Sequence, residues 1–428
     1  MTSGTLVLMG SGETTPTMVT THQKLFATTE QRSGGGVDAV LLDTPYGFQE
    51  NAAEISDKAK HYFAHHVGRD VRVVRARRLD RADALAVEST LDAVRRADWL
   101  FSGPGSPTYA IGQWSTAGFA DAFAAIVDGG GTVVLASAAA VTTGTRTIPV
   151  YEIYKAGVVP SWAPGLGVVE QVLGWRCVVI PHFDNAEGGT HDTRYCYLGR
   201  RRLELLEADL DADEWVLGID EHTAAILDLD AGTMRVEGRG GVHVRRDGLP
   251  VASWAAGDTV SLVEVGSGTA NGTVVIDDEP ASGLEGAEPA PTPMDEQVAA
   301  LARAFDTALD DLDADGATRA TLDLEELIRA WGADTQESDE HDRAVRTLRG
   351  MLTRLGRLAG EGMHDHRELV RPHIETLLHV REDARTRKAF EVADHIRVHM
   401  DADGVRVRDT HEGTEWDWDE PDLSPPEE

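Results

Sequence analysis

The sequence predicts an α/β protein with a mainly parallel sheet flanked by helices, followed by a mostly α-helical region that ends in a small β-hairpin. The prediction rests on short apolar runs bounded by Gly, Pro or Asp, on amphipathic stretches between those runs, and on a change to helical apolar spacing after about residue 294. Strands that alternate with helices favour a parallel sheet covered on both faces, where ligands bind at the carboxyl ends of the strands. Functional residues are therefore expected directly after the apolar runs.

The first part of the chain carries the strand-like runs, at 6–9, 37–42, 71–74, 99–102, 132–136 and 177–180. Amphipathic stretches at 52–66 and 82–97 predict helices between them. From residue 218 to about 265 the pattern changes to short strand-like pieces separated by Gly and Asp. We expect these pieces to be antiparallel additions that complete the first domain.

The second part begins with a predicted flexible acidic linker over 266–295, which is rich in Gly, Pro and Ala and has Val274–Ile276 as a candidate strand. Beyond it, the apolar spacing predicts helices, among them 344–358 and a pair at 366–380 and 382–400. We therefore expect three parts: an α/β domain over 1–265, the linker over 266–295, and a helical domain over 296–428.

The composition limits the function classes. The 428 residues carry a formal net charge of -33, which argues against general nucleic-acid binding because phosphate contacts need clustered Lys and Arg. The two cysteines do not form a disulfide framework in a chain of this size. The sequence shows neither a basic stretch before a signal-like core nor an apolar run of about 18 residues, so we expect a cytoplasmic protein without a membrane partner.

Ser137 follows the apolar run 132–136 and precedes three alanines. A strand followed at once by a closely packed helix would lift the serine hydroxyl out of the sheet, which is how several unrelated α/β hydrolases expose a nucleophile. The alternative is a small residue that fills a tight crossing.

A serine nucleophile needs a base nearby and a carboxylate that orients this base. Glu152 lies fifteen residues after Ser137, and His182 follows the apolar run 177–180 at the expected end of another strand. Taken singly, the glutamate is typical of a solvated surface and the histidine of a packed or capping residue. Together with Ser137 they form a candidate triad.

A series of motifs carries a resemblance over about residues 4–265. The motifs occur in the order Gly10–Glu13, Leu41–Pro45 with Asn51 and Ala52, Phe101–Ser106, the Ser137 turn, Pro181–Phe183 and Gly218–Ala224. This series resembles the cyanophycinase and aspartyl dipeptidase family of serine peptidases, which has a flavodoxin-like sheet related to class I glutamine amidotransferases. The family pattern has Gly two residues before and two residues after the serine, whereas this chain has Leu135 and Ala139.

The resemblance implies roles for individual residues. Ser137 corresponds to the nucleophile, His182 to the general base and Glu152 to the residue that orients the histidine. Backbone N–H groups of Gly105 and Ala138 would form the oxyanion hole. The stretch Arg200, Arg201 and Arg202 resembles one that binds a substrate carboxylate, although a salt-bridged helix start is an equal alternative.

No metal or organic cofactor is expected. His182, Asp184, His191 and Asp192 are suitable ligand types, but their spacing matches no compact metal motif. The segment Gly10–Gly12 lacks the third glycine or the lysine of a phosphate-binding loop.

The helical part has a resemblance of its own. Its motifs are Phe305–Asp313, Arg381–Phe390, Ala393–Arg397, Gly404–Thr410 and Gly413–Trp416. They resemble the anticodon-binding and tail region of cysteinyl-tRNA synthetases, over about residues 298–418. The catalytic signatures of that enzyme are missing from the sequence, so we do not expect synthetase activity. With 17 basic and 32 acidic residues between positions 301 and 428, tRNA is a disfavoured partner.

Two functions follow as hypotheses. The first is a serine hydrolase that cleaves a small peptide or isopeptide, with an Asp-containing substrate as one option. The second is a catalytically silent, amidotransferase-like binding module whose helical domain contacts tRNA or a protein partner. A homo-oligomer is compatible with both hypotheses.

Overall fold

The computed structural model describes residues 3–186, 191–268, 294–311, 313–331, 339–362, 366–410 and 413–418. It divides into two compact units, Met1–Leu348 and Arg349–Glu428. The division falls inside one helix, whereas the sequence analysis placed the boundary in the linker 266–295. Most of that linker, including the candidate strand Val274–Ile276, lies outside the described residues, so the predicted boundaries stay predictions.

An eight-stranded sheet forms the centre of the first unit. Its strands, in spatial order, are β14 (Thr259–Ser261), β11 (Thr233–Gly238), β10 (Thr223–Asp228), β1 (Thr5–Met9), β5 (Thr132–Ala136), β4 (Trp99–Ser102), β2 (Ala39–Leu42) and β3 (Arg72–Val74). The strands from β1 to β3 pair in parallel, and β10, β11 and β14 extend the sheet in antiparallel fashion. The order β3-β2-β4-β5 reproduces the 2-1-3-4 part of the flavodoxin-like order. The predicted fold class is confirmed.

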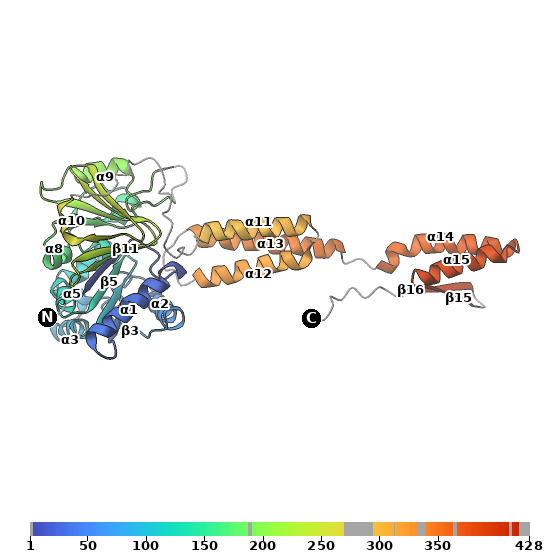
Figure 1. Ribbon diagram of the computed structural model, residues 1–428, viewed down its shortest axis with the longest axis horizontal. Helices are drawn as coiled ribbons and strands as arrows, with labels where there is room; N and C mark the ends of the chain where they lie inside the picture. Colours follow the sequence, from blue (N-terminus) through green and yellow to red (C-terminus); the bar gives the residue numbers. More distant parts are fainter. Residues whose placement is uncertain are drawn as a thin grey trace. The chain divides into compact units, whose positions relative to one another are not determined.

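Helices cover both faces of this sheet because alternate residues of each strand point to opposite sides. Val7 and Met9 pack with the buried residues of α1 (Val19–Ser33) and α2 (Ala52–Tyr62). Leu6 and Leu8 pack with those of α3 (Ala84–Arg95), α4 (Pro107–Trp114) and α5 (Phe119–Asp128). Figure 1 shows α1 and α2 on one side of the sheet and α3 and α5 on the other.

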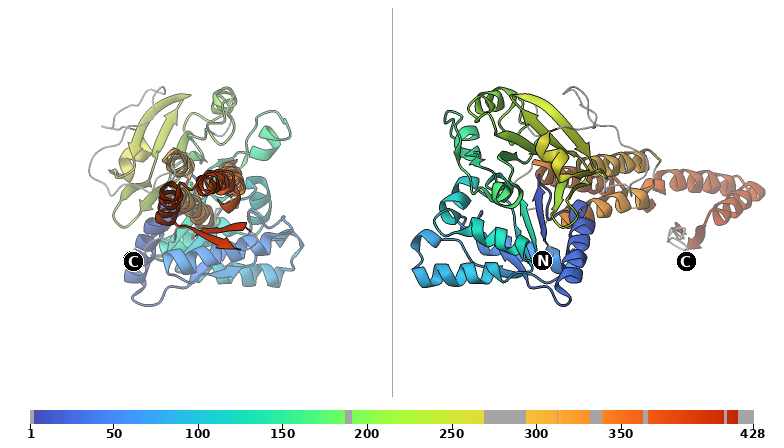
Figure 2. Two further views of the ribbon diagram at one scale, coloured as in Figure 1. Left: turned by 90° about the vertical axis from the view of Figure 1, so that its right-hand side faces the viewer. Right: turned by 60° about the vertical axis from the view of Figure 1, so that its left-hand side comes forward.

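A second sheet of four strands was not expected. It consists of β13 (Leu249–Ala255), β12 (Gly241–Arg246), β9 (Trp215–Ile219) and β8 (Cys177–Ile180), with β8 and β9 parallel. The strand Cys177–Ile180 therefore does not join the main sheet. The place beside β1 is occupied by β10, so β8 pairs with β9 instead. In both views of Figure 2 the yellow-green strands, which belong to both sheets, lie above the blue helices of the first part of the chain.

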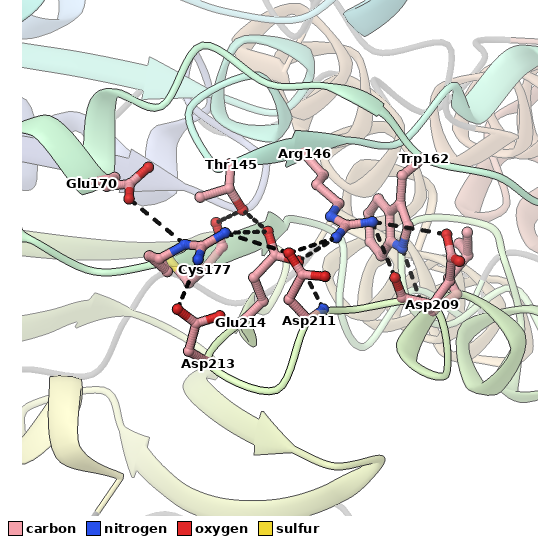
Figure 3. Close-up of polar contacts among 11 residues, drawn as sticks. Thr145, Arg146, Trp162, Glu170, Cys177, Asp209, Asp211, Asp213 and Glu214 are labelled. Carbon is pink, nitrogen blue, oxygen red and sulfur yellow. Dashed lines mark hydrogen bonds and ion pairs between the residues drawn. The ribbon is translucent and has the colours of Figure 1, made fainter.

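Ion pairs fix the loop that leads into β9 (Figure 3). Arg146, in the short strand β6 (Arg146–Thr147), lies 2.7 Å from a carboxylate oxygen of Glu214 and 3.3 Å from one of Asp211. Arg176 contacts Asp213 at 2.7 Å. The Glu214 side chain is only 2% exposed and also accepts a hydrogen bond from Thr145. The start of β9 is thereby tied to the segments that precede it.

The remaining elements are helical up to a terminal hairpin. They are α11 (Met294–Asp310), α12 (Ala314–Trp331), α13 (Asp339–Gly362), α14 (His366–Thr386), α15 (Phe390–Ala402) and the antiparallel pair β15 (Val405–Thr410) and β16 (Gly413–Trp418). In the second unit, buried residues of α14, α15 and β15 share one small core. None of the helices in the described ranges is long and apolar enough to cross a membrane.

The predicted break between the last two helices is wrong. Arg381 lies inside α14, where its guanidinium binds the Asp409 carboxylate of β15 at 2.7 and 2.8 Å. The chain reverses instead after Thr386, at Lys388, whose φ of 60° ends the helical run. The pair of helices is present, but the break between them lies at 387–389 and not at residue 381.

We predict that Arg146→Ala lowers the free energy of unfolding by about 2 kcal/mol, because it removes a partner of the buried Glu214 carboxylate. Midpoints of urea denaturation, followed by tryptophan fluorescence, measure the change. Arg96→Ala, which breaks the exposed pair with Asp92, is the control and should cost less than about 0.5 kcal/mol. Equal losses in both variants would contradict the prediction.

The effect of Arg146→Ala should also depend on pH. Burial acts to raise the pKa of Glu214, but the Asp211 N–H and Arg146 bring it below its ordinary value. The contribution of Glu214 to stability is therefore complete above about pH 4.3, the pKa of an unfolded glutamate, and is lost as the pH falls further. The difference between wild type and variant should shrink in acid.

Candidate functional site

Ser137 lies at the carboxyl end of β5, in a turn that its backbone does not adopt freely. Its φ is 48° and its ψ is -117°, and α6 (Ala138–Val141) begins at the next residue. The Ser137 N–H donates to Met9 O of the neighbouring β1 at 3.0 Å. A positive φ at a non-glycine residue is strained and persists only where its surroundings hold it. The expected strand-to-helix turn is present.

Leu135 and Ala139 stand where the resembling family has glycines, and the structure explains how they fit. Both are fully buried in the core on the side of α3, α4 and α5. Leu135 points into that core together with Val133, because alternate residues of a strand share one face. The Ala139 N–H donates to Gly103 O at 3.3 Å. Glycine is therefore not required at either position for the turn to form.

His182 reaches Ser137 from the second sheet. It follows β8, has a φ of 50°, and is only 4% exposed. Its Nε2 lies 2.9 Å from Ser137 Oγ. The N–H of Phe183 donates to Ile219 O of β9 at 3.1 Å, which fixes the backbone next to the histidine. The structure thus brings together the serine and the histidine expected from the sequence.

Glu221, and not Glu152, contacts this histidine. Its Oε1 lies 2.7 Å from His182 Nδ1 and also accepts a hydrogen bond from Asn185 at 2.9 Å. Glu152 lies in α7 (Val150–Tyr154), where it accepts a hydrogen bond from Thr108 at 3.1 Å. The expectation that Glu152 orients the histidine is therefore wrong, because the Glu152 side chain on α7 is directed toward Thr108 of α4. The motif Gly218–Ala224 contained the correct carboxylate, but gave it no role.

The charge on Glu221 determines which nitrogen of His182 carries the proton. Burial acts to raise the pKa of Glu221, but the hydrogen bond and charge of His182, together with Asn185, bring it below the ordinary value. An ionised carboxylate only accepts hydrogen bonds. The His182 Nδ1–H therefore donates to Glu221, and the unprotonated Nε2 accepts from the Ser137 hydroxyl. This is the arrangement that a general base requires.

Gly105 and Ala138 both lie beside Ser137, on the wall of one cavity. Gly105 has a φ of 143°, and a Cβ built at this residue would lie 2.2 Å from Pro45 O, so the loop after β4 tolerates no side chain there. Ala138 is the first residue of α6, and the N–H of a first helical residue has no acceptor within its helix. Both residues predicted for the oxyanion hole therefore line the same cavity as Ser137, and their role stays a prediction.

The cavity over Ser137 has a volume of about 700 Å³. Its walls combine aromatic rings with two cations: Tyr46, Phe48, Tyr151, Tyr154 and Tyr197, and Lys58 and Lys155. Lys58 lies 3.4 Å from Glu54 and is half exposed. Lys155 Nζ lies 4.9 Å from the centre of the Tyr151 ring. Two of the chain's five lysines thus line one cavity. The sequence analysis gave these lysines no role, and their rarity was the available signal.

The arginines 200–202 begin α9 (Arg200–Glu207) and are not among the residues that line this cavity. The Arg200 N–H donates to Asp192, and the Arg202 guanidinium donates to Leu198 O at 3.0 Å. These contacts fit the alternative of a polar helix start. Binding of a substrate carboxylate by these arginines stays a prediction.

Within the described part of the chain, no group of three or more His, Cys, Asp or Glu side chains has an arrangement that could hold a metal ion. Asp184 accepts a hydrogen bond from the Glu221 N–H at 2.7 Å. Asp192 binds Arg194, whose guanidinium lowers the Asp192 pKa to about 2. Between them, residues 187–190 lie outside the described part.

Comparisons with known proteins point in two directions. No family model matches the chain. It is 32% identical over 112 residues to a cysteine–tRNA ligase of Lysinibacillus sphaericus, covering 26% of this chain and 24% of the ligase. A cysteine–tRNA ligase of Bacillus velezensis is 29% identical over 114 residues, with the same shares covered. The chain therefore spans about a quarter of the length of these curated relatives.

Among solved structures, the chain is similar to a peptidase from an acI-B1 Actinobacterium. The identity is 22%, the TM-score is 0.48, and the match covers 61% of this chain and 97% of that one. The cysteine–tRNA ligase matches agree with the resemblance that the motifs of the helical part carry.

The strain at Ser137 can be measured without any activity. We predict that Ser137→Gly is more stable than Ser137→Ala by about 1 kcal/mol, because glycine adopts a positive φ at no steric cost. Both variants lose the same hydroxyl contact with His182, so each is the control for the other. Urea denaturation midpoints measure the difference. An alanine variant as stable as the glycine variant would show that the turn is relaxed.

Proposed function

We propose that the chain is a serine hydrolase that cleaves a small peptide or isopeptide bond. One observation carries the proposal: Ser137 Oγ, the His182 imidazole and the Glu221 carboxylate are joined in series by contacts of 2.9 and 2.7 Å. Ser137 and His182 also line a cavity large enough for a short peptide.

The geometry supports acyl transfer through the serine. Ser137 Oγ attacks the carbonyl carbon of the scissile bond, and His182 Nε2 takes the hydroxyl proton. The same proton then passes to the leaving amine as the carbon–nitrogen bond breaks, which leaves an ester on Ser137. Water, deprotonated by His182, hydrolyses this ester and restores the serine. Glu221 holds the imidazole and stabilises its protonated form.

Backbone N–H donors would stabilise the negative charge that develops on the carbonyl oxygen of the substrate. In this proposal the N–H groups of Gly105 and Ala138 bind that oxygen, and each such donor contributes about 3 kcal/mol to transition-state stabilisation in hydrolases of this type. The close approach of Gly105 to the Pro45 backbone leaves no room for a side chain, and the contact supports a fixed position of this loop beside Ser137.

The cavity favours a substrate with a carboxylate. Lys58 and Lys155 lie on its wall, and among the lining residues they are the groups with a permanent positive charge. A charge-assisted hydrogen bond from lysine to carboxylate is stronger than a neutral one. We therefore propose an acidic small peptide, such as one that contains Asp, as the substrate.

The helical region is proposed to serve as a contact module and not as a catalyst. Its similarity to cysteine–tRNA ligases covers only about a quarter of those enzymes. The excess of acidic residues after position 301 disfavours tRNA, so a protein contact is the better proposal.

A fluorophosphonate probe tests the proposed function directly. We expect the wild-type protein to be labelled and Ser137→Ala to remain unlabelled, because the probe reacts only with an activated serine. Ser115→Ala, which removes an exposed hydroxyl that donates to Ile111 O, should be labelled like the wild type. A folded wild-type protein without labelling would favour the silent binding module.

The same assay separates the two glutamates. Glu221→Gln should slow labelling by about 10³-fold or more, since a neutral partner no longer holds the required imidazole tautomer. Glu152→Gln is the matched control and should label at the wild-type rate, because Glu152 contacts Thr108 and not His182. Loss of labelling in the Glu152 variant would restore the original assignment.

The lysines should affect substrate binding more than the chemical step. We predict that Lys58→Met and Lys155→Met each raise KM for an acidic peptide about tenfold, the value of one charge-assisted hydrogen bond. Peptides of equal length with Asn in place of Asp should show little change. Lys60→Met, on the same helix as Lys58 but away from the cavity, is the control. A similar loss for the Asn peptide would contradict recognition of the carboxylate.

A further inference from the structure

Three consecutive residues beside the candidate site have a left-handed backbone. Tyr195, Cys196 and Tyr197 have φ values of 61°, 57° and 63°. Residues other than glycine visit this region singly, in turns, because Cβ crowds the following carbonyl oxygen. A run of three therefore needs strong support from its surroundings, and such strain is concentrated at functional sites.

Asp192 fastens the two ends of this turn. Its Oδ2 accepts from the Arg200 N–H at 2.9 Å, and its Oδ1 accepts from the Arg194 backbone N–H at 3.2 Å and from Arg194 Nε at 2.9 Å. Within the turn, the Tyr197 N–H donates to Thr193 O at 2.9 Å. One carboxylate thus bridges Arg194 and Arg200, six residues apart, and closes the strained segment between them.

The turn is also fixed to the backbone that carries His182. The Cys196 N–H donates to His182 O at 3.0 Å, and the Tyr195 N–H donates to Phe183 O at 2.9 Å. The buried Tyr195 ring packs edge-on against Phe183, with 4.7 Å between the ring centres. The strained turn and the histidine therefore form one locally rigid assembly.

Tyr197 is the side chain that this assembly presents to the site. Its ring centre lies 5.8 Å from that of His182 and 5.3 Å from that of Tyr154, and it lines the cavity over Ser137. The handedness of the backbone determines the direction of each Cα–Cβ bond. A right-handed turn between the same ends would therefore direct the side chains of this segment away from their present positions. The left-handed run places the Tyr197 ring against the imidazole.

We propose that Tyr197 is a positioning residue for His182, and that the turn closed by Asp192 holds its ring in place. The ring restricts the imidazole to the orientation in which Nε2 faces Ser137 and Nδ1 faces Glu221. The expected effect on the reaction rate rests on the proposed function, because a fixed imidazole orientation matters for catalysis only if His182 is the catalytic base. A misplacement of about 1 Å at a reacting group can cost about 100-fold in rate.

Kinetics give the first test. Tyr197→Leu should lower kcat about 10- to 100-fold with KM within about twofold, and slow fluorophosphonate labelling equally, whereas Tyr197→Phe keeps the ring and should restore the wild-type rate. Asp192→Ala changes no residue that lines the cavity but releases the turn that carries Tyr197, so it should give the same loss as Tyr197→Leu. A Tyr197→Leu variant that keeps kcat would overturn the inference and leave the proposed hydrolase intact.

Proton NMR of the imidazole gives a second test that needs no activity. The Nδ1–H that donates to Glu221 should give a low-field resonance, assigned by its loss in His182→Gln. We expect Tyr197→Leu and Asp192→Ala to broaden or abolish it through exchange, and Tyr197→Phe to retain it. Tyr151→Leu, in the same cavity, should leave it unchanged. If the wild-type protein resists labelling, the proposed function fails, but this resonance still decides whether Tyr197 orients His182.

Discussion

Strained backbone at the ends of strands is the constraint on which the candidate site depends. Eight non-glycine residues in the described part of the chain have a positive φ, and six of them, Ser137, His182, Tyr195, Cys196, Tyr197 and His222, lie at or next to the site. Each such residue costs on the order of 1–3 kcal/mol, so the surrounding fold must hold it. Met9 O holds Ser137, and the pairing of Phe183 with β9 holds His182. The strain therefore locates the site independently of any motif.

The two-sheet architecture explains why the three side chains meet. β8 and β9 run in parallel with Ile180 opposite Gly218, so the residues that follow both strands leave the same edge. His182 lies two residues after Ile180, and Glu221 lies three residues after Gly218. The imidazole and the carboxylate therefore lie side by side. Ser137 arrives from the other sheet. The imidazole and the carboxylate thus follow neighbouring strands of one sheet, and the ion pairs of Arg146 and Arg176 fix the chain that enters β9 (Figure 3).

The sequence predicted those parts of the site that local pattern determines. The fold class followed from the alternation of strands and helices. Ser137 comes directly after an apolar run, and His182 follows another such run through Pro181. Glu221 was not identified because its role depends on the pairing of β8 with β9, two strands 38 residues apart in their start positions, and pairing between distant segments leaves no local signal. Glu152 had the correct chemistry and a plausible distance along the chain, but α7 directs it toward Thr108. The left-handed turn at Tyr195–Tyr197 was not predicted either, because its residues are not the glycines that usually indicate a positive φ.

Charge in this molecule acts at two ranges with opposite effects on the proposed substrate. The net charge of -33 repels a small anionic peptide at long range, but at physiological ionic strength this field is screened beyond about 8 Å. At the cavity wall the distances are shorter, so Lys58 and Lys155 act on a bound carboxylate more strongly than the distant carboxylates do, although Lys58 also has Glu54 at 3.4 Å. An acidic surface and an acidic substrate are therefore compatible, provided that recognition is confined to contacts within the cavity. Most of the other positive charges in the chain are arginines. Several of those on the surface pair with neighbouring acids, as Arg96 does with Asp92 and Arg72 with Asp38.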